Sequence, residues 1–412
     1  MEFRLAYKMA NPVSVREVEK LDVPRFSLAE RDRRWRLVRQ LMSEEGLDVI
    51  VTTVNTGHWD HFQASTRYLT GVGGNCGEAS AVFPLEGEVT VIAMGIPPVH
   101  YWLGFQDWVA DIRNCNRYFG RGIVERLREL KMDRARIGIA GLYNISRAPE
   151  GVMPYGTMRT IEEAFPHATF VDASDLLERA KYVKSHEEID VLTKAVELAE
   201  KAIAVMAQSA RPGVRECEVY AAMIHAMVKE GGELPTMLQW SAGPEPQGNN
   251  IMPTLRPLQR GDIVMNEIEA RWAGYVGQGV QPMFIGHVDR VWHDIFSAFQ
   301  EVLQATYEVF KPGLTVGELN QFITDWGKKH TSFVVRPLFH GRGLGDDAPL
   351  SARTTTEAHA RWELRENVVF ILKPTVSTPE GRKRLYWGDC AVCTPKGARR
   401  LGRRPMEVIQ IQ

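Results

Sequence analysis

Four charged residues lie within or beside apolar or glycine-rich segments of the sequence. Burying a charge in such a segment is costly unless the charge is paired. Glu267 and Glu269 alternate along an apolar segment, so both side chains point to one side of a predicted strand. Arg342 lies between two glycines, and Lys373 follows the apolar run 368–372 directly before a proline. Carboxylates and cations gathered in this way could activate water, transfer a proton or hold an anion.

Each of these residues has a structural interpretation beside the chemical one. Arg342 could clamp a carboxylate or phosphate with its planar guanidinium, or be a surface arginine in a glycine-rich turn. Lys373 could bind an anion or transfer a proton, or form a structural ion pair with Glu267. Glu267 could act as a general base, or balance the charge of the two cations.

Several polar residues nearby are further candidates. His340 could transfer a proton near neutral pH, and Asn250 could position a substrate carbonyl. Tyr386 and Asp389, around the start of the predicted last strand, are candidates for substrate binding, and Asp389 is expected to support Lys373 or Arg342 as a neighbouring carboxylate.

Two other polar patterns carry weaker chemistry. His58 and His61 flank a tryptophan and an aspartate in a polar loop, which could lie at the rim of a substrate pocket but is better explained by a surface turn. Cys390 and Cys393 have C-x-x-C spacing, but no second pair accompanies them as a zinc site would require. We interpret them as core cysteines.

The elements that position these residues fall into two groups. The first half alternates helices with strands, which predicts an α/β domain over residues 1–178. Its predicted elements include a helix ended by Gly46 and a hairpin: helix 31–45, strand 48–54 and hairpin strands 79–83 and 89–94.

The second half separates long helices from strands, which predicts an α+β domain over residues 179–412. Apolar residues recur at helical spacing in the first three of the following segments, and β-forming residues dominate the others: 187–208, 218–231, 291–310, 263–270, 283–286, 368–372 and 390–394.

Composition narrows the class of protein. Among the 412 residues, 50 Lys and Arg face 51 Asp and Glu, which argues against a nucleic-acid binder that works through bulk charge. No apolar run approaches the ~18 residues of a membrane span, and no signal peptide is visible. Five scattered cysteines fit a reducing compartment, so we expect a cytoplasmic protein without nucleic-acid or membrane partners.

The order of five segments in the second half carries a family resemblance. These segments are Lys-Ser-His-Glu-Glu-Ile-Asp from Lys184, Arg-Gly-Asp-Ile-Val from Arg260, Phe-Lys-Pro-Gly-Leu-Thr from Phe310, Gly-Arg-Gly-Leu-Gly from Gly341 and Leu-Arg-Glu-Asn-Val-Val-Phe-Ile-Leu-Lys-Pro from Leu364. Together they resemble the creatinase / aminopeptidase P / prolidase family. The resemblance implies an α/β N-terminal domain, an α+β "pita-bread" C-terminal domain and a homodimer. It also places the loop of His58 and His61 near the partner's pocket.

The resemblance implies a metal site that this chain does not reproduce. Metallopeptidases of the family hold two metal ions with two Asp, one His and two Glu. The corresponding positions here are Glu267, Gln278, Arg342, Lys373 and Gly388. Because two of the five are cations, we expect no metal and no other cofactor.

The family's metal-free enzyme, creatinase, also differs from this chain. It uses a His and two Glu, and the corresponding positions here hold Asn250, a residue near Val280, and Lys373. Its substrate therefore cannot be carried over. Gln278, an amide in a former ligand position, could orient a polar group of the substrate.

The hypothesis that follows is a metal-independent hydrolase of a C–N bond in a small, anionic molecule. Glu267 would activate water, while Arg342 and Lys373 would hold a carboxylate or a developing oxyanion. A lyase on a small carboxylate substrate would need the same residues. The remaining hypotheses are a non-catalytic binding protein and, least favoured, a metal-dependent Xaa-Pro peptidase.

Overall fold

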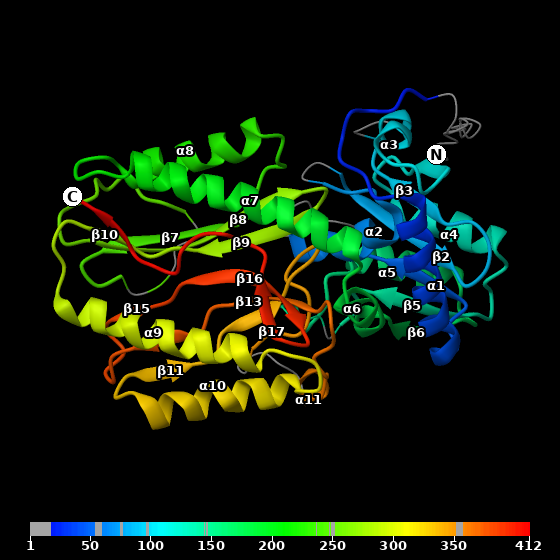
Figure 1. The fold of residues 1–412 in the computed structure, drawn as a ribbon. Helices are drawn as coiled ribbons and strands as arrows, with labels where there is room; N and C mark the ends of the chain where they lie inside the picture. The colour runs from blue at the N-terminus through cyan, green and yellow to red at the C-terminus, as the bar shows by residue number, and fades with distance from the viewer. Residues whose placement is uncertain are drawn as a thin grey trace. The chain divides into compact units, whose positions relative to one another are not determined.

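A computed structural model describes most of the chain as two compact units, Met1–Ala180 and Lys181–Gln412 (Figure 1). The described residues are 18–53, 60–74, 77–95, 99–143, 145, 147–235, 237–246, 248, 252–351 and 357–412, with the backbone alone for 60–63. Among them, no helix is long and apolar enough to cross a bilayer.

The first unit is built on a six-stranded mixed sheet with the order β4-β3-β2-β1-β5-β6. Its elements are α1 (Leu28–Glu45), β1 (Val49–Thr52), α2 (Asp60–Thr70), β2 (Ala79–Pro84), β3 (Thr90–Ala93), α3 (Val99–Phe105), β4 (Asp111–Asn114), α4 (Phe119–Glu129), β5 (Arg136–Ala140), α5 (Tyr155–Ala164), β6 (Thr169–Asp172) and α6 (Ser174–Tyr182). The predicted hairpin is confirmed as the antiparallel pair β2–β3.

The predicted first helix is also confirmed. The side chain of Ser27 caps its N-terminus by accepting from the backbone of Glu30. Gly46 ends the helix in the left-handed conformation, at φ 66°, which glycine adopts without steric cost.

The second unit contains a nine-stranded sheet and a three-stranded one. The larger sheet runs β12-β13-β16-β9-β8-β10-β18, with β17 beside β16 and β7 beside β8, and the smaller runs β11-β14-β15. The elements are α7 (His186–Ser209), α8 (Glu216–Lys229), β7 (Leu238–Gly243), β8 (Ile263–Trp272), β9 (Tyr275–Val280), β10 (Met283–Ile285), α9 (Arg290–Val309), α10 (Val316–His330), β11 (Val334–Arg336), β12 (Phe339–Gly341), α11 (Glu357–Ala360), β13 (Val369–Leu372), β14 (Thr375–Ser377), β15 (Arg384–Leu385), β16 (Gly388–Thr394), β17 (Gly397–Arg400) and β18 (Ile409–Ile411).

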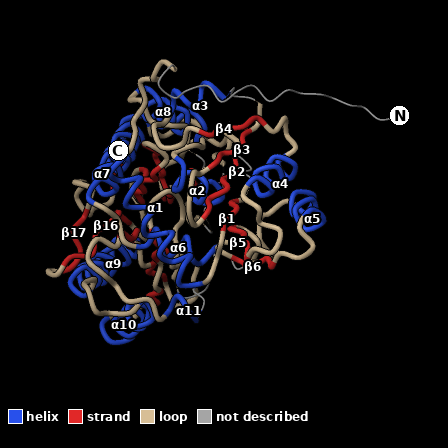
Figure 2. Tube along the Cα trace, turned by 90° about the vertical axis from the view of Figure 1, so that its right-hand side faces the viewer, coloured by secondary structure: helices blue, strands red, loops and turns tan. Residues whose placement is uncertain are grey.

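Two helix pairs enclose the strands of the second unit. Figure 1 shows α7 and α8 along β7, β8 and β9, and α9 and α10 on the side of β13 and β16. The tube view in Figure 2 shows the same helices as blue coils around red strands. The sheet therefore lies between helical layers, and its side chains are shielded from solvent.

Glycines on β9 decide which way its polar side chain points. A Cβ at Gly277 would overlap the α7 backbone at Ala195 and Val196, and one at Gly279 would lie 2.8 Å from Ile203. The helix therefore packs directly against the β9 backbone. Because side chains alternate along a strand, Gln278 between these glycines points away from α7.

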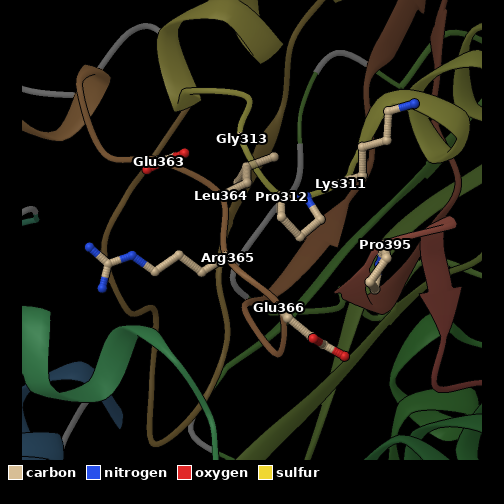
Figure 3. A pocket seen from close by; sticks show the side chains of 8 residues that line it. All are labelled: Lys311, Pro312, Gly313, Glu363, Leu364, Arg365, Glu366 and Pro395. Carbon is tan, nitrogen blue, oxygen red and sulfur yellow. The ribbon is translucent and has the colours of Figure 1, made fainter.

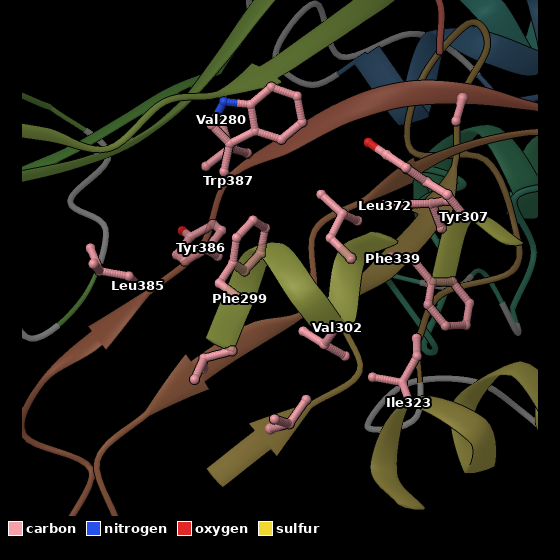
Figure 4. Close-up of a cluster of buried hydrophobic side chains, with 14 of the residues drawn as sticks. Val280, Phe299, Val302, Tyr307, Ile323, Phe339, Leu372, Leu385, Tyr386 and Trp387 are labelled. Atoms are coloured by element: carbon pink, nitrogen blue, oxygen red, sulfur yellow. The ribbon is translucent and has the colours of Figure 1, made fainter. Parts of the chain in front are cut away.

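Apolar residues of α9 and α10 pack against β12, β13 and the segment before β16 (Figure 4). Phe339 stacks on Phe370, with ring centroids 5.5 Å apart. Leu372 also points into this core, so Lys373, one residue later, points elsewhere.

Candidate functional site

Five residues that are distant in the chain meet through one network of hydrogen bonds. They are Glu267 on β8, Gln278 on β9, Arg342 after β12, Lys373 after β13 and Tyr386 before β16. These elements are neighbours in the large sheet, which explains how the residues come together. We call this set the polar cluster.

The carboxylate of Glu267 accepts three hydrogen bonds within the polar cluster. Lys373 Nζ lies 2.7 Å and Gln278 Nε2 2.9 Å from Oε2, and the Tyr386 hydroxyl lies 3.2 Å from Oε1. The ion pair expected between Lys373 and Glu267 is therefore confirmed. Glu267 keeps 7 % of its surface exposed, against 2 % for Lys373 and none for Gln278.

Arg342 lies on the other side of Gln278 and is fully buried. Its Nε donates to Gln278 Oε1 at 3.2 Å, Nη2 donates to Glu269, and Nη1 lies 2.9 Å from Asp346 Oδ1. Burial acts to lower the pKa of this guanidinium, but the carboxylates of Glu269 and Asp346 raise it overall.

This burial corrects the sequence-based role of Arg342. We expected its guanidinium to clamp a substrate anion or to lie on the surface in a glycine-rich turn. The structure instead directs it at carboxylates of its own chain. The expectation that cations accompany Glu267 and Glu269 is confirmed, since Lys373 binds the first and Arg342 the second.

His340 lies on the Arg342 side of the polar cluster. Its Nδ1 is 3.0 Å from the carbonyl oxygen of Gly341 and 3.4 Å from Asp346 Oδ1, and its side chain is buried. The structure therefore associates it with Asp346 rather than with Glu267. Its role in proton transfer stays a prediction.

Asp389 was wrongly expected to support Lys373 or Arg342. It pairs with Arg400 at 2.9 Å, whereas the next residue, Cys390, contacts the backbone of Gln278. Consecutive strand residues point to opposite faces, so Asp389 lies behind the polar cluster. Burial raises the pKa of this carboxyl, although Arg404 and Arg400 oppose the shift.

The structure does not describe the side chains of the remaining candidates. Asn250 and His58 lie outside the described residues, and His61 belongs to α2 with only its backbone described. Their roles stay predictions. Cys390 and Cys393 are buried free thiols, as expected of core cysteines.

Sequence reasoning missed how the turn that carries Arg342 is held. Asp347 binds Lys184 at 2.9 Å and Lys181 at 3.4 Å, and all three side chains are buried. A Cβ at Gly343 would overlap the Asp347 carboxylate, so a larger residue there would displace this carboxylate from its present position beside Lys184. The two consecutive aspartates in a glycine-rich turn were the signal in the sequence: Asp346 faces the guanidinium and Asp347 anchors the turn.

A separate depression of about 470 Å³ lies elsewhere on the second unit (Figure 3). It is lined by Lys311, Pro312, Gly313, Glu363, Leu364, Arg365, Glu366 and Pro395. None of these residues belongs to the polar cluster. Its two basic and two acidic residues give it no dominant charge.

Comparison with known proteins identifies the family. Residues 190–395 match metallopeptidase family M24, and residues 34–183 match the creatinase/prolidase N-terminal domain. The chain belongs to metallopeptidase family M24. The resemblance seen in the sequence and the predicted pairing of an α/β domain with a pita-bread domain are therefore confirmed.

The relatives of this M24 chain are hydrolases. A Xaa-Pro dipeptidase of Pyrococcus furiosus is 24% identical over 268 residues, covering 63% of this chain and 74% of the relative. A creatinase of a Bacillus species is 23% identical over 365 residues, covering 85% and 82%. The X-Pro aminopeptidase from Thermotoga maritima shares the fold, with TM-score 0.75, 22% identity and coverage of 92% and 99%.

The family's description implies a metal, but the residues present do not fit one. In the described part of the chain, no three His, Cys, Asp or Glu residues are grouped so as to hold a metal ion. Glu267 and Glu269 instead face the ammonium of Lys373 and the guanidinium of Arg342. A dication in contact with these carboxylates would also lie close to the two cations, which would repel it.

Proposed function

We propose that this M24 chain is a metal-independent hydrolase that cleaves a C–N bond in a small, anionic molecule. The observation that carries the proposal is the carboxylate of Glu267, which three donors orient while its side chain keeps some exposure to solvent. An oriented carboxylate at a partly open position can accept a proton from water.

The reaction would use the chain's own side chains. Glu267 would take a proton from a water molecule as its oxygen attacks the substrate carbon. Lys373 and Tyr386, which both point at Glu267, would donate to the oxyanion that forms. The C–N bond would then break, with its electron pair left on nitrogen and the proton delivered to that nitrogen from Glu267.

An anionic substrate is supported by the chemistry of Lys373 alone. Its ammonium is 2.7 Å from Glu267, and a carboxylate of the substrate would share that cation. Arg342 would not touch the substrate, because it is fully buried.

The decisive experiment compares activity with and without metal. Purified protein would be assayed with small amides, amidines and lactams bearing a carboxylate, by following amine or ammonia release, with a chelator present throughout. We expect turnover that resists the chelator and is lost in Glu267→Gln. Turnover of Xaa-Pro dipeptides only after manganese or zinc is added would overturn the proposal, and an unsaturated product would indicate a lyase.

A non-catalytic binding protein is the second candidate, and one observation favours it. Arg342 and Lys373 pair with carboxylates of their own chain, and both are at most 2 % exposed. Cations engaged in this way would not stabilise an oxyanion, so a ligand bound beside the polar cluster would not be converted. Recovery of a bound small molecule unchanged after prolonged incubation, with no product from any substrate tested, would favour this function.

A further inference from the structure

The guanidinium of Arg342 is surrounded by oxygen acceptors from four residues. They are the side chains of Glu269, Gln278 and Asp346, and the carbonyl oxygen of Gly345 at 3.3 Å from Nη1. Two of the four are carboxylates. Such a shell resembles the oxygen environment that a hard cation prefers, but its occupant is covalently part of the chain.

The same guanidinium determines the orientation of the neighbouring amide. Arginine can only donate, so the oxygen of Gln278 must face Nε of Arg342. The NH₂ group of Gln278 then faces Oε2 of Glu267 and donates to it. A reversed amide would place two donors together on one side and two acceptors on the other.

We infer that Arg342 is a built-in counter-ion in the place of a metal, and a positioning residue that orients Glu267 through Gln278. The counter-ion role follows from the contacts alone. The positioning role rests on the proposed function, because it concerns how Glu267 is presented to water.

An ordinary structural ion pair would lack the second role. Arg34 in the first unit forms such a pair: it is 1 % exposed, binds Glu30 at 2.7 Å and lies over the rings of Phe26, Tyr68 and Trp108. These partners all belong to the first unit and none is a member of the polar cluster. Arg34→Lys is therefore a matched control for the loss of a buried arginine.

Chemical rescue tests the counter-ion role without any substrate. Arg342→Ala removes the cation and leaves its shell, so we expect a lower melting temperature that millimolar methylguanidinium restores and equal sodium chloride does not. Arg342→Ala combined with Glu269→Gln should lose the rescue, because one carboxylate of the shell is neutral. Equal responses to both salts, or rescue that survives in the double variant, would overturn the counter-ion role.

If Arg342→Ala fails to fold, Arg342→Lys and metal analysis of the natural chain replace it. We expect well under one manganese, zinc or cobalt ion per chain after incubation and buffer exchange. One ion per chain that is lost in Glu269→Gln would overturn the inference, since the carboxylates would then bind metal despite Arg342.

The positioning role is read from the kinetics of the folded variants. Arg342→Lys keeps the charge but loses the planar group that directs Gln278, so we expect kcat to fall about 10²-fold with KM nearly unchanged. Arg34→Lys should leave both constants unchanged at temperatures where it is folded. An unchanged kcat in Arg342→Lys would overturn the positioning role, whereas absence of turnover in the natural chain would refute only the proposed function and leave the rescue result standing.

Discussion

Two buried arginines of the second unit lie on opposite sides of β16 and are held in different ways. Arg342 faces the side chains of Glu269, Gln278 and Asp346. Arg404 instead donates to the carbonyl oxygens of Val280 and Gly388, at 3.4 and 2.8 Å. Arg404 also donates to the amide oxygen of Gln281 at 2.6 Å. Arg342 therefore contacts two carboxylates directly, whereas the hydrogen bonds of Arg404 go to neutral oxygens.

The pKa values of the two guanidiniums shift in opposite directions. Burial lowers the pKa of Arg404, and the nearby carboxylates of Asp389 and Glu200 do not offset it. For Arg342, the carboxylates outweigh burial and raise the pKa. Arg404 also lies 4.6 Å from the ring of Trp387. The comparison shows that carboxylates in direct contact with Arg342 outweigh its burial, whereas the carboxylates near Arg404, with Glu200 at 3.7 Å from Nε, do not.

The largest effect is expected where the polar cluster meets solvent. Glu267→Gln should lower kcat by about 10²–10⁴-fold, because the base is removed while the shape is kept. Steady-state kinetics would measure this loss, with any substrate that the assay in the presence of a chelator identifies. The same substitution combined with Lys373→Met removes the unpaired ammonium, so it should recover stability but not activity. Recovery of activity in the double variant would place the base elsewhere.

The next effect contrasts the two arginines directly. Arg342→Met leaves two buried carboxylates without their cation and should cost about 3–5 kcal/mol of the free energy of unfolding. Arg404→Met loses hydrogen bonds to neutral carbonyls and should cost less, about 1–3 kcal/mol. Urea denaturation of both variants gives the ranking. A larger loss of unfolding free energy for Arg404→Met would contradict this ranking. It would mean that the carboxylates near Arg404 depend on their cation more than those around Arg342 do.

The stability of the fold is expected to depend on pH through Asp389, which points away from the polar cluster. The folded state raises the pKa of Asp389, so its contribution favours folding at low pH and is lost as pH rises through the folded value. Asp389→Asn should therefore gain stability relative to the natural chain as pH rises above about 4, the ordinary value for Asp, with no difference well below it. Urea denaturation across that range measures the change, and a gain that grows toward acid would contradict it.

The smallest effect is expected at an exposed cluster of the first unit. Hydrogen bonds from Arg113 lower the pKa of Glu129 to about 2, but the Glu129 side chain is 48% exposed. Its contribution is present above the ordinary value of Glu and is lost as pH falls toward 2. Because solvent screens the pair, Glu129→Gln should cost less than about 1 kcal/mol at neutral pH, measured by thermal unfolding in low and high salt. A loss as large as that of Arg342→Met would remove the distinction between buried and exposed ion pairs.

Local patterns predicted much of the fold but not every element. Gly46 ended the first helix as expected, and the apolar run 368–372 became β13. Helix α10 was not predicted, although Thr315 and Glu318 form a capping box at its start and Leu319 and Ile323 are buried one turn apart. The helical spacing of apolar residues was present, but α10 is shorter than α7 and α9 and more polar than the long helices that the sequence predicted in this unit.

The sequence by itself determined the family and the two-domain fold, because these follow from residue types and their order. It also predicted that Gln278, Arg342 and Lys373 stand where relatives hold metal ligands. It also placed Glu267 and Glu269 on one side of a strand, since alternation is a local property. Only the tertiary structure decided the partners of Arg342 and Asp389. Arg342 binds Glu269 and Asp346, whereas Asp389 turns to Arg400. Those pairings depend on which strands become neighbours and which face each residue takes, and no local pattern encodes the contact between β8 and the turn after β12.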